Sequence, residues 1–310
     1  MKFLGILPLL FGLVFLISAC QSAQQNLDND TTITELNFPF ATHTLTQVVL
    51  PTVQISPTNT TTSTSIPPTL TPTKVKCTEP SGFVEEVYFP SQLLKEDILA
   101  NIYLPPCYDP EQQDGYPFLV LLHGQNGNQN QWMEIGFTDL VDEWISTEKI
   151  PPMVIIMPFE RQYLIDPSRS EYDEALVQDL LPQLLESYNL RTEWQYRAIG
   201  GLSRGGNWAL YIAFKHPDAF GKVAAHSYPG FAGDMFRAQT WVEQSVSAYR
   251  PALWFDIGEY DQYRKYGEPI ILYLQKSGIP LEYTVYEGGH TIEYWKTHIQ
   301  DYLAWYTKNW

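Results

Sequence analysis

The stretch GGLSRGG, residues 200–206, places a single hydroxyl group, that of Ser203, among four glycines. It contains the pattern G-x-S-x-G at the end of the apolar run RAIGGL, and the helical pattern WALYIAF follows it. A serine between a strand and a helix lies on a sharp turn that exposes its hydroxyl as a nucleophile, and side chains at Gly201 and Gly205 would collide across that turn. A phosphate-binding loop would need a Gly-Lys-Ser/Thr ending, which is missing here. A glycine-rich loop that only closes a strand is the other alternative.

A serine nucleophile needs a neighbouring base, and the chain contains six histidines. His290 follows the last predicted strand in the loop EGGH, and catalytic groups gather at the carboxyl ends of strands in parallel sheets. His226 also ends a predicted strand and is the second candidate. His43 lies in a polar stretch, His216 at a predicted helix end and His298 on a predicted helix. The sequence therefore favours His290 as the base.

The base needs a carboxylate to orient it, and the segment WFDIGEYD offers three. Asp261 lies beyond the end of the predicted strand, so it is the first candidate. Glu259 is the second, and Asp256, which lies inside the strand, is the third. With Asp261, the order along the chain is Ser203, acid, His290, which is the order of α/β-hydrolases.

The negative charge that develops on the substrate oxygen needs hydrogen-bond donors. One expected donor is the backbone N–H of Arg204, which directly follows the serine. The second is expected from the loop after an early strand, and LVLLHGQNG has this form. The sequence therefore predicts the backbone N–H of Gln125 as the second donor and a structural role for His123.

Short apolar runs and amphipathic segments alternate from residue 78 onward, which predicts the fold class. The predicted strands are 83–89, 98–104, 118–122, 154–157, 197–202, 222–225, 253–257 and 282–286. The predicted helices are 137–147, 172–188, 204–215, 266–276 and 291–305. Pro182 is expected to kink or split the second helix, and the last helix carries an apolar stripe of Ile292, Trp295, Ile299, Tyr302 and Trp305. Two initial strands followed by alternation predict an α/β fold with a mostly parallel central sheet, antiparallel first strands and helices on both faces.

Residues 83–310 resemble the esterase D, feruloyl esterase and enterochelin esterase-like group of α/β-hydrolases. The matching stretches occur in the order of that group and are IYLPP (102–106), LHG (122–124), GLSRGG (201–206), HPDAF (216–220), GEYD (258–261) and GGH (288–290). The resemblance implies the α/β-hydrolase fold and a serine carboxylesterase with Ser203 as nucleophile, Asp261 as acid and His290 as base. It also supports Gln125 and Arg204 as the oxyanion donors. Cys107 departs from the group, which usually has a small residue there.

The predicted reaction is hydrolysis of an ester by way of an acyl-enzyme, with neither a metal nor an organic cofactor. Trp132, Tyr163 and Trp295 are expected to line a pocket for a sugar or phenolic group, with core or rim packing as the alternative for each. The loops 126–136, 159–170 and 230–249 are expected to shape that pocket. Transfer of the acyl group to a sugar or lipid hydroxyl is an alternative activity. A surface binding module on an inactive hydrolase scaffold is an alternative of another class.

The N-terminal segment predicts export. Residues 1–19 have the layout of a signal peptide, and the ending ISAC resembles a bacterial lipobox, which implies lipid attachment to Cys20; an ordinary signal or an uncleaved anchor is the alternative. Residues 20–77 are rich in Ser, Thr and Pro and predict a disordered stalk, so the esterase domain is expected at 78–310. The net charge of −16 argues against nucleic acid as a partner. A membrane is expected to be contacted through the lipid alone, with the domain outside the cytoplasm of a bacterial cell.

Cys77 and Cys107 are the remaining cysteines and frame the first two predicted strands. If these strands form a hairpin, the two residues lie at its open end, at bridging distance. In an exported protein such a pair indicates a disulfide, and two free thiols are the alternative. The spacing of cysteines and histidines matches no recognised metal site.

Overall fold

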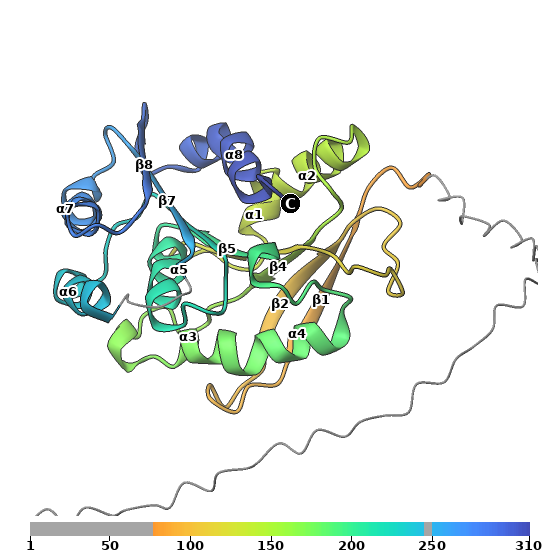
Figure 1. The fold of residues 1–310 in the computed structure, drawn as a ribbon, viewed down its shortest axis with the longest axis horizontal. Helices are drawn as coiled ribbons and strands as arrows, with labels where there is room; N and C mark the ends of the chain where they lie inside the picture. The colour runs from red at the N-terminus through yellow and green to blue at the C-terminus, as the bar shows by residue number, and fades with distance from the viewer. Residues whose placement is uncertain (1–76, 245–249) are drawn as a thin grey trace, which may run out of the picture. The chain divides into compact units, whose positions relative to one another are not determined.

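The computed structural model describes residues 77–244 and 250–310 (Figure 1). The predicted signal segment 1–19, the predicted lipid site Cys20 and the predicted stalk up to residue 76 lie outside the described residues.

The core of the domain is an 8-stranded sheet with the order β1-β2-β4-β3-β5-β6-β7-β8. The pairs β1–β2 and β2–β4 are antiparallel, and every other pair is parallel. The predicted sheet, antiparallel at its start and parallel afterwards, is therefore confirmed. The strands are β1 (Phe83–Phe89), β2 (Ile98–Leu104), β3 (Phe118–Leu122), β4 (Val154–Pro158), β5 (Arg197–Leu202), β6 (Lys222–His226), β7 (Ala252–Gly258) and β8 (Glu282–Tyr286).

Helices cover both faces of the sheet (Figure 1). Helices α1, α2 and α8 share one apolar cluster with the sheet, and α4, α5, α6 and α7 share the other. The helices are α1 (Gln131–Glu134), α2 (Phe137–Ser146), α3 (Tyr172–Glu174), α4 (Leu181–Ser187), α5 (Arg204–Lys215), α6 (Asp234–Gln244), α7 (Arg264–Lys276) and α8 (Ile292–Thr307).

The sequence of the central strand β3, FLVLL, is a continuous apolar run, and its surroundings explain this. Phe118, Val120 and Leu122 belong to one core cluster, and Leu119 and Leu121 belong to the other. Successive side chains of a strand point to opposite faces, and both faces are covered by helices here. All five side chains are buried, so no polar alternation appears.

The predicted helix 172–188 is interrupted, and Pro182 is the physical reason. The segment Ala175–Leu180 forms a π-helix between α3 and α4, and Pro182 lies in the first turn of α4. Proline cannot donate the helical hydrogen bond, and its ring collides with the preceding turn. The wider π-turn lets the chain continue along nearly the same path.

The expectation that residues 126–136 and 230–249 are loops is wrong in part, because these segments contain the helices α1 and α6. Helix α6 buries only Asp234, Ala238 and Trp241, so its apolar period is too weak to be recognised. The predicted stripe of α8 is confirmed in part: Trp295 and Tyr302 are buried, and Ile299 and Trp305 pack against the core. Ile292 is 56% exposed instead, and Tyr294 and Tyr306, which lie outside the predicted stripe, are buried.

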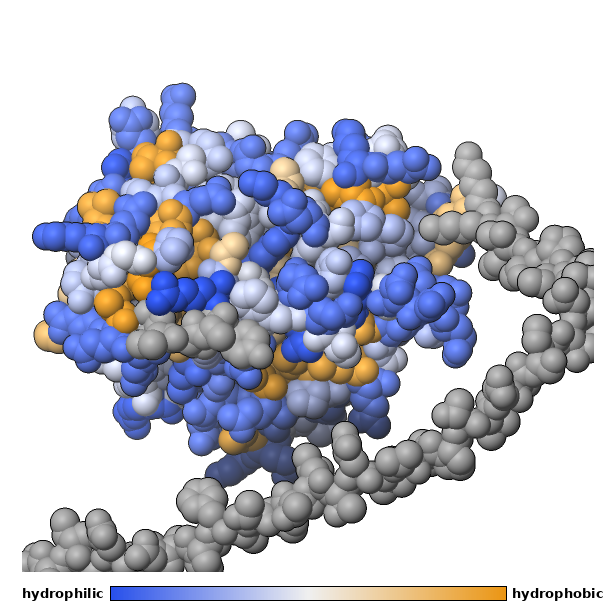
Figure 2. All heavy atoms as spheres, in the orientation of Figure 1, coloured by the Kyte–Doolittle hydropathy of each residue, from blue (hydrophilic) through white to orange (hydrophobic). Residues whose placement is uncertain are grey.

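Figure 2 shows hydrophilic side chains over most of one face, with small apolar patches between them. No helix within 77–244 and 250–310 has the length and apolar character needed to cross a membrane.

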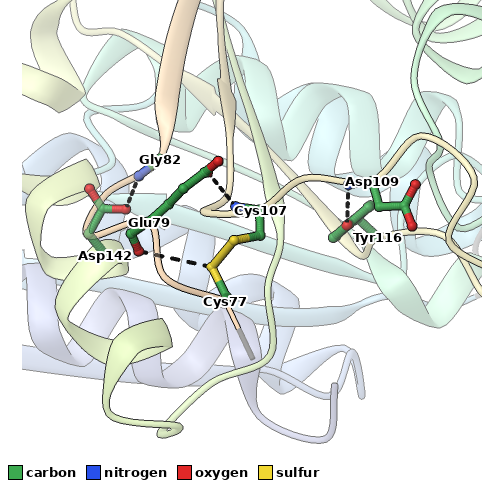
Figure 3. The surroundings of a disulfide bond; sticks show 7 residues. All are labelled: Cys77, Glu79, Gly82, Cys107, Asp109, Tyr116 and Asp142. Atoms are coloured by element: carbon green, nitrogen blue, oxygen red, sulfur yellow. Dashed lines mark hydrogen bonds between the residues drawn. A yellow bond between two sulfur atoms is a disulfide. The ribbon is translucent and has the colours of Figure 1, made fainter. Parts of the chain in front are cut away.

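A disulfide joins Cys77 and Cys107 at the open end of the β1–β2 hairpin (Figure 3). The Glu79 carboxylate accepts a hydrogen bond from the Cys107 N–H at 2.7 Å. The Gly82 N–H donates to the Asp142 carboxylate of α2, also at 2.7 Å. The disulfide and the Glu79–Cys107 bond hold the two ends of the hairpin together, and the Gly82–Asp142 bond attaches the hairpin to α2.

We expect Cys107→Ser to lower the free energy of unfolding by about 3–4 kcal/mol, because the bridge closes a long loop in the unfolded chain. The two cysteines are separated by 30 residues. Urea unfolding of the full chain measures the difference. Reduced wild type should match the variant, and equal stability of oxidised wild type and variant would contradict the prediction.

Candidate active site

Three side chains form a continuous chain of hydrogen bonds at the carboxyl ends of the parallel strands. The His290 Nε2 lies 2.8 Å from the Ser203 Oγ, and the His290 Nδ1 lies 2.7 Å from the Asp261 Oδ2. The Asp261 carboxylate can only accept, so the Nδ1 carries the proton and the Nε2 is free to accept the Ser203 proton. The structure thus brings together the predicted nucleophile, base and acid in a geometry that allows proton transfer.

Ser203 lies on a strained turn between β5 and α5, with φ 51° and ψ −114°. A Cβ on Gly201 would lie 2.3 Å from the carbonyl carbon of Gly205. A Cβ on Gly205 would lie 2.4 Å from the Leu122 carbonyl oxygen, so this glycine is required by β3 and not by Gly201. Both glycines of the pattern are needed, as the sequence predicts, but the second has a different neighbour.

The neighbouring Gly200 faces the opposite side of the sheet. A Cβ there would lie 1.6 Å from the Tyr306 hydroxyl of α8. The absence of a side chain at Gly200 therefore lets Tyr306 reach the sheet beneath the nucleophile.

The loops after β7 and β8 touch, and this contact brings the acid to the base. A Cβ on Gly258 would lie 2.4 Å from the Gly288 carbonyl oxygen. The Asp261 Oδ1 accepts the Tyr263 N–H at 2.8 Å. The rings of Tyr263 and Trp295 contact the His290 ring edge-on, with centroids 4.7 and 5.3 Å away. These contacts restrict the orientations of both the acid and the base.

The other candidates for acid and base form a second Asp–His pair. His226 and Asp256 are 0% exposed, and their nearest atoms, Nδ1 and Oδ1, are 2.5 Å apart. The Asp256 Oδ2 accepts from the hydroxyls of Tyr294 (2.7 Å) and Tyr302 (3.2 Å). The Tyr306 hydroxyl lies 2.9 Å from the His226 Nε2. Burial raises the pKa of Tyr306 well above the usual range of a tyrosine. This pair belongs to the core, while Glu259 is exposed.

Both predicted oxyanion donors lie beside the serine. A Cβ on Gly124 would lie 3.6 Å from the Ser203 Cβ, so the loop that carries Gln125 runs past the nucleophile. Arg204 is the first residue of α5, so its N–H has no acceptor within the helix. Ser203, Gln125 and Arg204 line the same cleft, which has a volume of about 590 Å³.

The predicted substrate contacts agree with this cleft only in part. Trp295 lines the cleft and donates its indole N–H to the Ser227 hydroxyl at 2.9 Å. Trp132 is 1% exposed, and its indole N–H donates to the Leu122 carbonyl, so it packs in the core instead. Tyr163 is half-buried and does not line the cleft. Proximity to a motif in sequence does not fix the direction of an aromatic side chain.

The cleft is lined by Asn126 and Phe231, from the predicted pocket loops 126–136 and 230–249, but by no residue of the predicted loop 159–170. Sequence reasoning missed Asn207, Gln262, Tyr263 and Tyr266, which also line the cleft. A usable signal existed, because most of them follow the end of β7. Within the described part of the chain, no three metal-ligating side chains converge.

The Arg204 side chain forms a buried ion pair with Glu160, which the sequence did not indicate. Its Nε and Nη2 donate to the two carboxylate oxygens at 2.8 and 2.6 Å. The Glu160 N–H donates to the His123 Nε2 at 2.8 Å, and the His123 Nδ1 donates to the Gly124 carbonyl, also at 2.8 Å. Because its two nitrogens have these opposite partners, the His123 ring is neutral. Burial lowers its pKa accordingly.

We expect stability to fall as the pH drops below about 6.5, the ordinary pKa of histidine. With the pKa of His123 lowered in the folded state, the unfolded chain binds more protons between these two pKa values. Stability therefore rises with pH through this window and is fully present above it. Thermal unfolding between pH 7.5 and pH 5 tests this, with His123→Gln expected to flatten the slope. An equal slope in both proteins would contradict the prediction.

A serine on a strand-to-helix turn, an acid and a base after the last strands, and a mostly parallel sheet together define the α/β-hydrolase class. Residues 91–306 match a family model described as Putative esterase. The chain belongs to this family.

The relatives include an endo-1,4-beta-xylanase/feruloyl esterase of Xylanibacter ruminicola, 29% identical over 45% of this chain and 21% of that protein. An esterase of Mycobacterium tuberculosis is 25% identical over 62% of this chain and 52% of that protein. The chain thus spans at most about half the length of either relative.

Among solved structures, a ferulic acid esterase has a TM-score of 0.62 at 23% identity, covering 74% of this chain and 98% of that chain. The enterobactin esterase of Shigella flexneri has a TM-score of 0.60 at 18% identity, covering 72% of this chain and 59% of that chain. At these identities the likeness shows a shared fold.

Proposed function

We propose that this chain is a serine carboxylesterase that hydrolyses an acyl or feruloyl ester through an acyl-enzyme. The observation that carries the proposal is the hydrogen-bonded chain from Ser203 through His290 to Asp261, on a cleft that Gln125 and Arg204 also line. Membership of an esterase family supports it.

The proposed reaction has two halves. The Ser203 Oγ attacks the ester carbonyl carbon while its proton passes to the His290 Nε2, and the carbonyl oxygen becomes negative. The backbone N–H groups of Gln125 and Arg204 donate to that oxygen. The bond to the alcohol then breaks as His290 returns the proton to the leaving oxygen. Water, deprotonated by His290, releases the acid and restores the Ser203 hydroxyl.

The proposed substrate is an ester carried on a carbohydrate, with Trp295 as a contact. The name of the Xylanibacter relative, which includes both a xylanase and a feruloyl esterase, supports this choice. The cleft is lined by aromatic residues, among them Phe231, Tyr263 and Tyr266, and such rings suit flat phenolic groups and sugar rings.

The test of this function is hydrolysis by the purified full chain of a short-chain aryl ester, methyl ferulate and feruloylated oligosaccharides. Ser203→Ala is the control for each substrate. Equal slow rates for wild type and this variant on all three would overturn the proposal. Product analysis with an added alcohol separates hydrolysis from acyl transfer.

We expect Tyr266→Ala to lower kcat/KM for feruloyl esters by about twofold to tenfold, because an aromatic contact contributes about 0.5–1.5 kcal/mol. Tyr266 is 57% exposed and lines the cleft. Tyr260→Ala is the matched control, since this neighbour is 71% exposed and lies off the cleft. Equal losses in the two variants, measured by steady-state kinetics, would refute a specific contact.

We also propose export and anchoring through a lipid on Cys20, with the domain outside the cytoplasm. The signal-like segment 1–19 supports this location, and so does the disulfide between Cys77 and Cys107, since disulfides persist in oxidising compartments. Cys20→Ser should move the protein from the membrane fraction to the soluble fraction of a bacterial host. Unchanged fractionation would contradict anchoring by a lipid.

A further inference from the structure

Glu160 makes hydrogen bonds in two directions, and each leads to one of the two oxyanion donors. Its carboxylate accepts from the Nε and Nη2 of Arg204. Its backbone N–H donates to the Nε2 of His123. Both side chains of the Glu160–Arg204 ion pair are buried, with 4% of the Glu160 side chain and 9% of the Arg204 side chain exposed.

The carboxylate side of Glu160 fixes the first donor. A bidentate pair holds the planar guanidinium in one orientation, and the guanidinium also lies 5.2 Å from the ring centroid of Phe231. Arg204 supplies the backbone N–H that follows the nucleophile. Restraining its side chain from the far end therefore restrains the first turn of α5.

The backbone side of Glu160 fixes the second donor. The His123 ring, held by the Glu160 N–H, donates from its Nδ1 to the Gly124 carbonyl oxygen. The Gly127 N–H donates to the same oxygen at 2.9 Å. In a trans peptide the N–H points away from the carbonyl, so fixing the Gly124 oxygen fixes the Gln125 N–H.

The negative charge of Glu160 is neutralised by Arg204, so it does not oppose catalysis at the nearby nucleophile. A lone carboxylate near the nucleophile would disfavour the negative oxygen of the transition state. Paired with Arg204 in two short hydrogen bonds, it adds no net charge to the site. The pair therefore provides rigidity without opposing the reaction.

We propose that Glu160 is a positioning residue that aligns both oxyanion donors, acting through Arg204 on one and through His123 on the other. This inference rests on the proposed esterase function. Donors aligned in advance act mainly in the transition state, so their misalignment lowers kcat and leaves KM nearly unchanged.

The test compares Glu160→Gln with a matched control, Asp173→Asn, in the full chain. Asp173 is also a buried carboxylate, and it pairs with Lys215 at the other end of helix α5, 2.7 Å away. Each variant is assayed with an aryl ester and with the corresponding thionoester. Sulfur accepts hydrogen bonds poorly, so the ratio of the two rates reports how much the donors contribute.

We expect Glu160→Gln to lower kcat for the ester about 10²-fold, the size of the loss of one oxyanion donor, and to lower the ester-to-thionoester ratio. Asp173→Asn should leave that ratio at the wild-type value. A wild-type ratio in Glu160→Gln, or an equal fall in Asp173→Asn, overturns the inference. Absence of hydrolysis by wild type would overturn the proposed function instead.

A second variant covers the case in which Glu160→Gln does not fold. The double change Glu160→Met with Arg204→Met removes both charges, keeps the backbone N–H of residue 204, and replaces a buried pair by apolar side chains, which proteins often tolerate. It should fold, with a lowered kcat and a lowered ester-to-thionoester ratio. Wild-type kinetics in this double variant would also overturn the inference.

Discussion

Ser203→Ala is expected to lower kcat for ester hydrolysis by about 10⁶-fold, the loss found when the nucleophile of a catalytic triad is removed. The hydroxyl oxygen lies 2.8 Å from the base, and the residue is 9% exposed. Alanine deletes only this hydroxyl, so the backbone turn and the fold are expected to persist. Steady-state kinetics measures the loss of kcat, and thermal unfolding measures whether the fold persists.

Asp261→Asn tests the assignment of the acid and is expected to lower kcat by about 10⁴-fold. The Tyr263 N–H needs an acceptor, so the amide oxygen faces Tyr263 and the amide nitrogen faces the His290 Nδ1. That nitrogen can only donate, so the imidazole takes the tautomer that cannot accept the Ser203 proton. Glu259→Gln is the matched control, because this carboxylate lies two residues away and is exposed; its kcat should stay near the wild-type value. Activity lost in Glu259→Gln and kept in Asp261→Asn would show that the acid is wrongly assigned.

The parts of the site that the sequence predicts are those whose chemistry is tied to strand ends. Ser203, Asp261 and His290 each directly follow or lie just beyond an apolar run, and a parallel sheet brings such positions to one edge. The glycines around Ser203 are recognisable because their cause is steric and local. Distances of 2.7 and 2.8 Å between these side chains follow from contacts between loops, such as Gly258 with Gly288, which no local pattern reveals.

The features of the site that the sequence does not predict depend on contacts between residues far apart in the chain. Glu160 lies in a loop without periodicity, and its partner Arg204 is 44 residues away. The sequence predicts Trp132 as an aromatic residue of the pocket, yet its direction is set by core packing against α2 and α8. The stripe of α8 is incomplete for a related reason. The hydroxyl groups of the buried Tyr294 and Tyr302 donate to the Asp256 carboxylate of β7, and hydrophobicity alone cannot indicate such a pairing.

Asp256→Asn is expected to lower the free energy of unfolding by about 3–5 kcal/mol, the usual cost of breaking a buried ion pair or its hydrogen-bond network. The carboxylate accepts from His226, Tyr294 and Tyr302, and it is 0% exposed. Burial and the charge of Asp256 raise the pKa of Tyr302 well above its usual range, so this hydroxyl keeps its proton and donates. An amide offers one acceptor oxygen to these three donors and turns an N–H group towards one of them, which leaves a buried group without a partner.

Asp301→Asn is the matched control, because Asp301 also pairs with a histidine, His298, but its side chain is 51% exposed. An exposed pair of this kind contributes about 0–1 kcal/mol, so its loss should change urea unfolding little. Asp256→Asn should lose stability and still hydrolyse esters below its melting temperature, whereas Asp261→Asn should lose activity while it remains folded. A catalytic loss in Asp256→Asn as large as that in Asp261→Asn, without a loss of stability, would mean that the buried pair acts in the reaction. The two Asp–His pairs of this sheet are thus separated by opposite outcomes, because one meets the cleft and the other joins helix α8 to the strands beneath the nucleophile.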